Sequence, residues 1–97
     1  MLSIVFSWDD KKNEANKKKH NISFEEAQTV FFDENALEYF DPDHSEDEDR
    51  FLMLGMSYLL RILIVAHCFR KSDSEIRIIS ARKATKKEQE EYLGGKQ

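Results

Sequence analysis

The stretch RFLMLGMSYLLRILIVAHCFRKSDSEIRIISAR, residues 50–82, decides the fold of this chain. It contains three runs of aliphatic, β-branched and aromatic residues, at 50–58, 60–69 and 75–82, and each run predicts a strand. A very short turn separates the first two runs. The four residues before the last run, Lys71-Ser72-Asp73-Ser74, have the composition of a hairpin loop. The stretch therefore predicts three consecutive strands.

The middle run is apolar on both sides of the expected strand. Ile62, Ile64 and Ala66 point to one side, whereas Leu63 and Val65 point to the other. A strand with two apolar sides is stable when both faces of its sheet are covered. We expect this run to be the central strand, with other elements packed at least partly over both faces.

Upstream, residues 2–8 predict a first strand. Residues 11–20 predict a helix with Asp9 or Asp10 as its N-cap and Asn21 as a left-handed C-cap. That helix has almost no apolar face, because Ala15 is its only aliphatic residue. It must therefore dock through polar contacts and the preceding tryptophan, or present its lysines to a partner.

A second helix is expected from Ser23, which can form a capping box with Glu26, to about residue 33. Residues 33–50 hold nine acids and predict a solvated loop, with room for a short strand at 36–40. Thr85 is suited to cap a last helix that reaches Leu93. The expected fold is α+β in the order βααβββα, with a small sheet packed by N-terminal helices and followed by a C-terminal helix.

Composition places the chain among small globular proteins, and we expect residues 1–97 to form a single domain. The 97 residues are 40% hydrophobic and 35% charged, which is not the composition of a disordered chain. The longest apolar run, 62–66, is far too short to span a bilayer, and no secretory signal is visible. Cys68 is the only cysteine, so we expect a reduced, cytoplasmic protein without a membrane partner.

Several kinds of site are excluded by pattern. The chain has no glycine-rich phosphate loop and no nucleophile elbow. Its acidic tract resembles a calcium loop, but Glu46 stands where glycine is required and Leu52 where the last ligand should be. The histidines and the cysteine are too dispersed for a local zinc motif. We therefore expect neither a metal nor a cofactor.

Charge is segregated along the chain, which has a formal net charge of −4. Lysines gather near both ends, and three arginines lie at expected strand boundaries, where they can converge on one groove: Arg50, Arg70 and Arg82. RNA cleavage needs cations to hold the phosphate, and an acid and a base to move protons. Arginine fits the first task and histidine the second. Composition and spacing alone indicate a small α+β domain with an anion-binding groove.

Each candidate also has a structural interpretation. His67, on the central strand, is either a catalytic group or a core histidine satisfied by a hydrogen bond. The lysines at 17–19 form either a solvated helix face or a phosphate contact. Arg82 can form a structural ion pair with Glu48 or Glu75.

Motifs in a fixed order cover nearly the whole chain. They are Phe6-x-Trp8-Asp9, Asn16-x-x-Lys19-His20-x-Ile22-x-Phe24-x-Glu26-Ala27, Val30-Phe31-x-Asp33, Asp43-His44-Ser45-x-x-Glu48-x-Arg50, Gly55, Arg77-Ile78-Ile79-Ser80-Ala81-Arg82-x-Ala84, Glu88 and Tyr92. In this order they resemble the BrnT family of bacterial type II toxins. The chain departs from the family at Asn21, where glycine is usual, and in a heavier acidic tract at 46–49.

The resemblance implies a RelE-like fold and a ribonuclease that arrests growth by cutting RNA without a metal. Its partners would be an RNA substrate and a BrnA-type antitoxin with a ribbon-helix-helix part, which alone would contact operator DNA. The catalytic candidates are Glu48, Arg50, His67 and Arg82. The RNA-binding candidates are Lys18, Lys19, His20, His44, Arg70 and Lys83.

Within that set, Arg50 and Arg82 are expected to stabilise phosphate and transition-state charge, and Glu48 or a histidine to move protons. Dense carboxylates repel RNA, so the tract 46–49 is expected to face away from the groove or toward a basic antitoxin segment. Two other functions remain open. One is a non-catalytic module that binds an antitoxin, and the other is a metal-dependent nuclease that uses the acidic loop.

Overall fold

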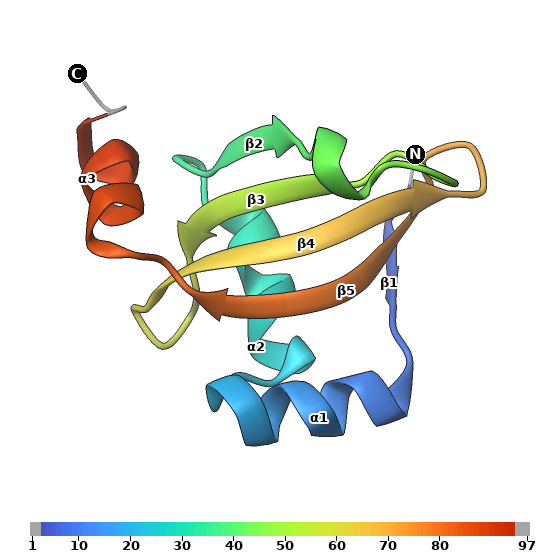
Figure 1. Cartoon of the computed structure of the whole chain (residues 1–97), viewed down its shortest axis with the longest axis horizontal. Coiled ribbons are helices and arrows are strands. Elements are labelled where there is room, and N and C mark those ends of the chain that lie inside the picture. The colour runs from blue at the N-terminus through green and yellow to red at the C-terminus, as the bar shows by residue number, and fades with distance from the viewer. Residues whose placement is uncertain (1–2, 95–97) are drawn as a thin grey trace.

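The computed structural model describes residues 3–94, which form a five-stranded mixed sheet with helices on both faces (Figure 1). The strand order is β1-β5-β4-β3-β2. The elements are β1 (Val5–Ser7), α1 (Asp10–His20), α2 (Phe24–Ala27), the 3₁₀ helix η1 (Gln28–Phe32), β2 (Leu37–Phe40), the 3₁₀ helix η2 (Pro42–His44), β3 (Phe51–Met56), β4 (Ile62–Arg70), β5 (Glu75–Lys83) and α3 (Lys86–Gly94).

The α+β class is confirmed, and β4 is the central strand as its apolar pattern predicted. The order differs from βααβββα by one strand, because the short segment at 36–40 does form β2 and pairs antiparallel with β3. The first strand is shorter than predicted, and Leu2 lies outside the described residues. The second helix changes to 3₁₀ geometry after Ala27. Within residues 3–94, no helix is long and apolar enough to cross a bilayer.

β1 pairs with β5 in parallel, with Val5 opposite Glu75, whereas β2 to β5 form antiparallel pairs. The pairing of β4 with β5 contains a bulge. Ala66 lies opposite Ser80 and His67 opposite Ile78, which leaves Ile79 as the extra residue. A bulge bends the strand and changes the direction of nearby side chains, and it often lies beside a functional site.

The two faces of the sheet are covered differently. α2 and η1 pack on one face, here called the helical face, where Phe24 and Val30 meet Leu63 and Val65 in the larger core. In Figure 1 these helices pass behind the strands. The other face, which carries Ile64, is here called the open face. It is covered by α3 at one end only, where Tyr92 and Ala84 form the smaller core, and this leaves room for a site.

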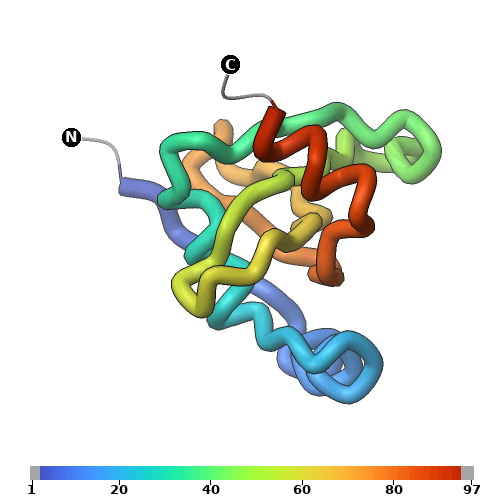
Figure 2. Tube along the Cα trace, turned by 90° about the vertical axis from the view of Figure 1, so that its left-hand side faces the viewer, coloured from blue at the N-terminus to red at the C-terminus, as the bar shows by residue number. Residues whose placement is uncertain are grey.

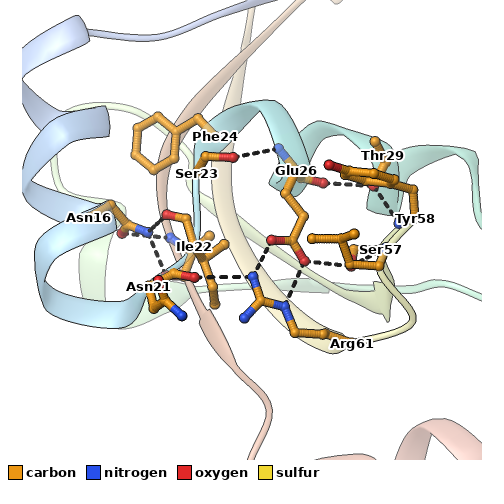
Figure 3. Close-up of polar contacts among 12 residues, drawn as sticks. Asn16, Asn21, Ile22, Ser23, Phe24, Glu26, Thr29, Ser57, Tyr58 and Arg61 are labelled. Carbon is orange, nitrogen blue, oxygen red and sulfur yellow. Dashed lines mark hydrogen bonds and ion pairs between the residues drawn. The ribbon is translucent and has the colours of Figure 1, made fainter.

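α1 docks through buried amides, because its only alanine is exposed. Asn16 Nδ2 donates to the carbonyls of Ile22 (2.8 Å) and Ala81 (2.9 Å), and Asn16 Oδ1 accepts from the Ala81 N–H (3.1 Å; Figure 3). Trp8 also packs edge-on against Phe24. The polar docking that the sequence predicted is confirmed. Asn21 adopts φ 59° as the predicted C-cap.

The side chain of Glu26, which the sequence predicted to complete a capping box with Ser23, instead forms an ion pair with Arg61. Its backbone N–H donates to Ser23 Oγ, so half of the predicted capping box forms. Its carboxylate, however, accepts hydrogen bonds from Ser57 Oγ (2.7 Å) and Arg61 Nε (2.9 Å), and Arg61 also donates to the Asn21 carbonyl (Figure 3). Burial raises the pKa of Glu26, but the hydrogen bonds from Arg61 and Ser57 outweigh burial and hold the pKa below its usual value. This buried pair joins α2 to the β3–β4 turn.

Candidate functional site

A cavity of about 310 Å³ opens on the open face, between the loop that follows β2 and the far ends of β4 and β5. Its lining residues come from three segments that are distant in sequence, and they are His44, Glu46, Asp47, Glu48, Arg50, Cys68 and Ile79. Ile79 is the bulged residue of β5, so the bulge forms part of the cavity wall.

Backbone hydrogen bonds hold the loop over this end of the sheet. The Asp41 N–H donates to the Arg50 carbonyl (2.8 Å), which closes the loop at its base. Ser45 Oγ donates to the Asp41 carbonyl (2.6 Å) and accepts from the Arg50 N–H (2.9 Å). Pro42 begins η2, where its fixed φ suits the first helical position. Arg50 is thereby fixed at the cavity, immediately before β3.

Glu48 forms an ion pair with Arg70, in which Arg70 Nε and Nη2 each lie 3.3 Å from a carboxylate oxygen. The hydrogen bonds from Arg70, and a further one from the Cys68 thiol, lower the pKa of Glu48. Glu48 is therefore a carboxylate at neutral pH. Burial and the nearby Glu48 raise the pKa of the Cys68 thiol. Cys68 therefore lies in the wall as a neutral thiol, which makes it a poor nucleophile.

Arg50 is the cation in the cavity lining that is available to bind an anionic ligand. Among the described residues its guanidinium has no ion pair, although its charge also lowers the pKa of Glu48. An unpaired guanidinium in a cavity can bind a phosphate with two parallel hydrogen bonds.

His44 is oriented by a carboxylate. Its Nδ1 lies 3.1 Å from Asp41 Oδ2, and its ring is exposed at the cavity rim. When Nδ1–H donates to Asp41, Nε2 is directed away from that carboxylate and can exchange a proton with a ligand.

Arg82 lies three residues after Ile79 on β5, about 10 Å further along the open face. Its guanidinium makes a two-pronged ion pair with Glu88 of α3, with Nη1–Oε1 2.8 Å and Nη2–Oε2 2.9 Å. The structural ion pair considered for Arg82 does form, but with Glu88 and not with Glu48 or Glu75, because the first turn of α3 brings a nearer carboxylate. Glu88 also accepts from the Thr85 N–H, and Thr85 Oγ1 accepts from the Glu88 N–H, which confirms the capping box.

The Arg82–Glu88 pair predicts a dependence of stability on pH. Arg82 foremost, and the Thr85 N–H, lower the pKa of Glu88 from 4.5 to about 2. A depressed folded-state pKa stabilises the fold above the unfolded-state pKa, and this contribution is lost as pH falls from about 4.5 toward about 2. We expect Glu88→Gln to unfold with a shallower loss of free energy than wild type between about pH 5 and about pH 3. Urea titrations measure this, with the exposed Glu90→Gln as control, and parallel slopes for wild type and Glu88→Gln would contradict it.

His67 lies apart from this group. It is completely buried on the helical face, among the rings of Phe31, Phe51 and Phe69. Its Nδ1 contacts the Val65 carbonyl (3.0 Å) and its Nε2 contacts Glu38 Oε1 (3.0 Å). Successive residues of a strand point to opposite faces, so the sheet separates His67 from Cys68 and the cavity. Its geometry is that of a core histidine satisfied by hydrogen bonds.

The other predicted RNA-binding residues lie outside the cavity. Lys18, Lys19 and His20 form the last turn of α1, which stands away from the open face in Figures 1 and 2. Lys83 is exposed at the end of β5. The structure brings together Glu48, Arg50, Arg70 and His44 and places Arg82 on the same face.

Two features of the site were missed by sequence reasoning. The acidic tract does not face away from the groove, because Glu46, Asp47 and Glu48 all line the cavity. Arg77 was also overlooked as a candidate. It lies opposite Cys68 in the β4–β5 ladder, so its side chain projects from the open face. The alternation of apolar and polar residues along 76–82 could have identified Arg77 as a residue of the open face, although the bulge at Ile79 breaks that alternation. Within residues 3–94, no cluster of three or more His, Cys, Asp or Glu could hold a metal ion.

Comparison with known proteins identifies a family and a similar solved structure. A family model described as the ribonuclease toxin BrnT of type II toxin–antitoxin systems matches residues 8–88. The structure is similar to the 1.1 Å crystal structure of the Brucella abortus ribonuclease toxin BrnT, with a TM-score of 0.61. That match covers 89% of this chain and 100% of the other at 22% sequence identity, so it shows a shared fold. The comparison with curated proteins finds no match.

Proposed function

Since this chain belongs to the BrnT family of ribonuclease toxins of type II toxin–antitoxin systems, we propose that it cuts RNA on the open face of its sheet without a metal ion. The observation that carries this proposal is the cavity where an unpaired Arg50, the carboxylate of Glu48 and the oriented ring of His44 meet. The protein would act in the cytoplasm as a single RelE-like domain.

The proposed reaction is attack of a ribose 2′-oxygen on the adjacent phosphorus. Glu48, kept anionic by Arg70, accepts the proton of the 2′-hydroxyl. The bond from phosphorus to the 5′-oxygen breaks, and His44, oriented by Asp41, gives that oxygen a proton. The products are a 2′,3′-cyclic phosphate and a 5′-hydroxyl. Atoms and charges balance without a metal.

The cations stabilise the additional negative charge of the phosphorane-like transition state. Arg50 is placed to contact the reacting phosphate, and Arg82 holds a phosphate further along the open face. Arg70 extends this positive path, whereas Lys83 lies opposite Leu63 in the β4–β5 ladder and projects to the helical face, where it would contact only RNA that passes around the sheet. Lys18, Lys19 and His20 would contact only a long RNA that continues past the sheet, and His67 has no place in the proposed chemistry.

One observation favours the alternative of a non-catalytic, antitoxin-binding module. Glu46 and Asp47 line the same cavity as the proposed catalytic groups, and carboxylates there oppose the approach of a phosphate. In that case the cavity would bind a basic segment of the antitoxin. The chain would then contribute to repression of its own operon without cutting RNA.

The test is cleavage of a defined RNA by the purified chain in EDTA and, as a separate condition, cleavage of translated RNA on ribosomes in magnesium buffer, followed by analysis of the product ends. Cyclic phosphate ends from wild type, with at least a 100-fold slower reaction for Glu48→Gln, are the expected result. Asp43→Gln, in the same loop but outside the cavity lining, is the control and should cleave like wild type. Activity on the free RNA that needs added magnesium would overturn the metal-free mechanism. A folded chain that cleaves under neither condition would establish the non-catalytic alternative.

The antitoxin partner is proposed as a BrnA-type protein with a ribbon-helix-helix part, through which alone the complex would contact operator DNA. Membership of a type II toxin–antitoxin family supports a protein antitoxin as the partner.

A further inference from the structure

A second hollow, of about 410 Å³, lies on the helical face between β1, the end of η1 and the start of β2. We call it the apolar groove, and its main lining residues are Phe6, Phe31, Phe32, Phe69 and Ile76. Glu38 is the one charged residue among those described as lining it. Neither the small core under α3 nor the proposed cleavage site uses this groove.

The groove exposes large apolar side chains that a solvated surface does not require. Phe32 is 74% exposed and Ile4 is 58% exposed. The Phe32 ring packs edge-on against Phe6, at 6.0 Å between centroids, so it is held in place over the groove. A rimmed patch of this kind is typical of a protein interaction site.

The apolar groove continues into an acidic hollow. Phe69 lines both, and it contacts the Phe51 ring at 5.4 Å between centroids. The neighbouring hollow is lined by three carboxylates as well, Glu48, Asp49 and Asp73. We call these three residues the acidic end. The surface therefore changes from apolar to negative along one continuous path.

We propose that this path binds a segment of the antitoxin in which apolar side chains are followed by lysine or arginine. Phe32 and Phe6 would contact the apolar part, and the acidic end would pair with the basic part by charge complementarity. This inference rests on the proposed function, because it assigns the surface on which the toxin meets its partner.

The position of Glu48 gives the contact an inhibitory consequence. Glu48 lines both the acidic end and the cleavage cavity, and it is held there by Arg70. A basic antitoxin side chain that pairs with Glu48 lowers its ability to accept a proton, and it also blocks the cavity entrance. Binding in the apolar groove would thus inhibit cleavage without covering the whole open face.

The test is the affinity of the purified toxin for its cognate antitoxin, produced from the same operon and measured by calorimetry. Phe32→Asp removes the exposed anchor, and its exposure means that the fold tolerates the change. Leu60→Asn is the matched control, because Leu60 is 78% exposed elsewhere and its φ of 62° suits asparagine. We expect Phe32→Asp to bind about 30-fold or more weakly, as for an interface hot spot, and Leu60→Asn to bind like wild type.

The acidic end is tested separately with the double variant Asp49→Asn and Asp73→Asn, and with Asp43→Asn as the loop control. We expect only the double variant to bind more weakly and to show a smaller dependence of affinity on salt. If Phe32→Asp and the double variant both bind like wild type, the surface assignment is wrong. If Phe32→Asp instead changes a dimer of the free chain into a monomer and leaves antitoxin affinity intact, the groove joins two copies and the proposal is overturned.

The same variants separate this inference from the proposed function. Expressed in cells, Phe32→Asp should still arrest growth but should no longer be rescued by the antitoxin. If wild type fails to cleave RNA while Phe32→Asp loses antitoxin affinity, the proposed reaction fails and the docking surface stands.

Discussion

Arg82→Ala is expected to abolish growth arrest and to slow cleavage of subsaturating RNA by about 10- to 100-fold, because it removes a charge-assisted contact with a phosphate next to the reacting one. Arg82 is the candidate cation held most firmly, because Glu88 fixes both prongs of its guanidinium at 2.8 and 2.9 Å. Single-turnover cleavage of a defined RNA measures the effect. Antitoxin affinity should be unchanged, since Arg82 does not line the apolar groove.

A structural role for Arg82 would produce a different pattern of variants. Glu88→Gln breaks the ion pair but leaves the guanidinium and the Thr85 cap acceptor in place. If Arg82 only holds α3, both variants should lose stability and activity together. If Arg82 acts on RNA, Glu88→Gln should retain most activity. Wild-type cleavage by a folded Arg82→Ala would contradict its assignment to the site.

Glu26→Ala is expected to lower the free energy of unfolding by about 3 kcal/mol, which is the lower end for breaking a buried ion pair. The Glu26 side chain is only 3% exposed, whereas that of Arg61 is 25% exposed, so water can solvate part of the guanidinium that loses its partner. The substitution also leaves Ser57 Oγ without its acceptor. For a chain of this length, the melting temperature should fall by about 12 to 24 °C, measured by circular dichroism.

The control for this result is Glu90→Ala, an exposed glutamate of α3, which should change stability by less than about 0.5 kcal/mol. Glu26→Gln should be intermediate, because its amide keeps an acceptor for Ser57 but loses the charge. Equal melting temperatures for Glu26→Ala and Glu90→Ala would show that the network in Figure 3 contributes little.

Local patterns predicted much of this fold. The two-sided apolar run at 62–66 identified the central strand, because only a covered strand tolerates that composition. The caps at Asp9, Asn21 and Thr85 were also predicted, since a cap depends on a few neighbouring residues. The resemblance to BrnT toxins is now confirmed over residues 8–88.

The errors came from contacts between segments that are distant in sequence. The partner of Arg82 was not among the two carboxylates considered, because the direction in which α3 leaves β5 is not a local property. The role of His67 could not be chosen until three phenylalanines and Glu38 were placed around it. The direction of the acidic tract depended on hydrogen bonds of Ser45 that no sequence period reveals.

Gly55 illustrates the same limit within a strand. A Cβ at this position would lie 2.9 Å from both Ala36 Cβ and Val30 Cγ1, so the close approach of η1 to β3 requires glycine. The sequence showed a glycine in a strand, but not which neighbour needed the space.

The parallel pairing of β1 with β5 joins the beginning of the chain to its last third. The β4–β5 hairpin closes a loop of four residues, from Lys71 to Ser74, whereas Val5 and Glu75 are 70 positions apart. By loop-closure entropy, joining β1 costs about 2.5 kcal/mol more than closing the hairpin. β1 has only three residues to offset that cost, so its attachment depends on Phe6 and Trp8 in the core and on the two hydrogen bonds that tie Asn16 to Ala81. The first fifth of the polypeptide is therefore secured to the sheet only once β5 exists.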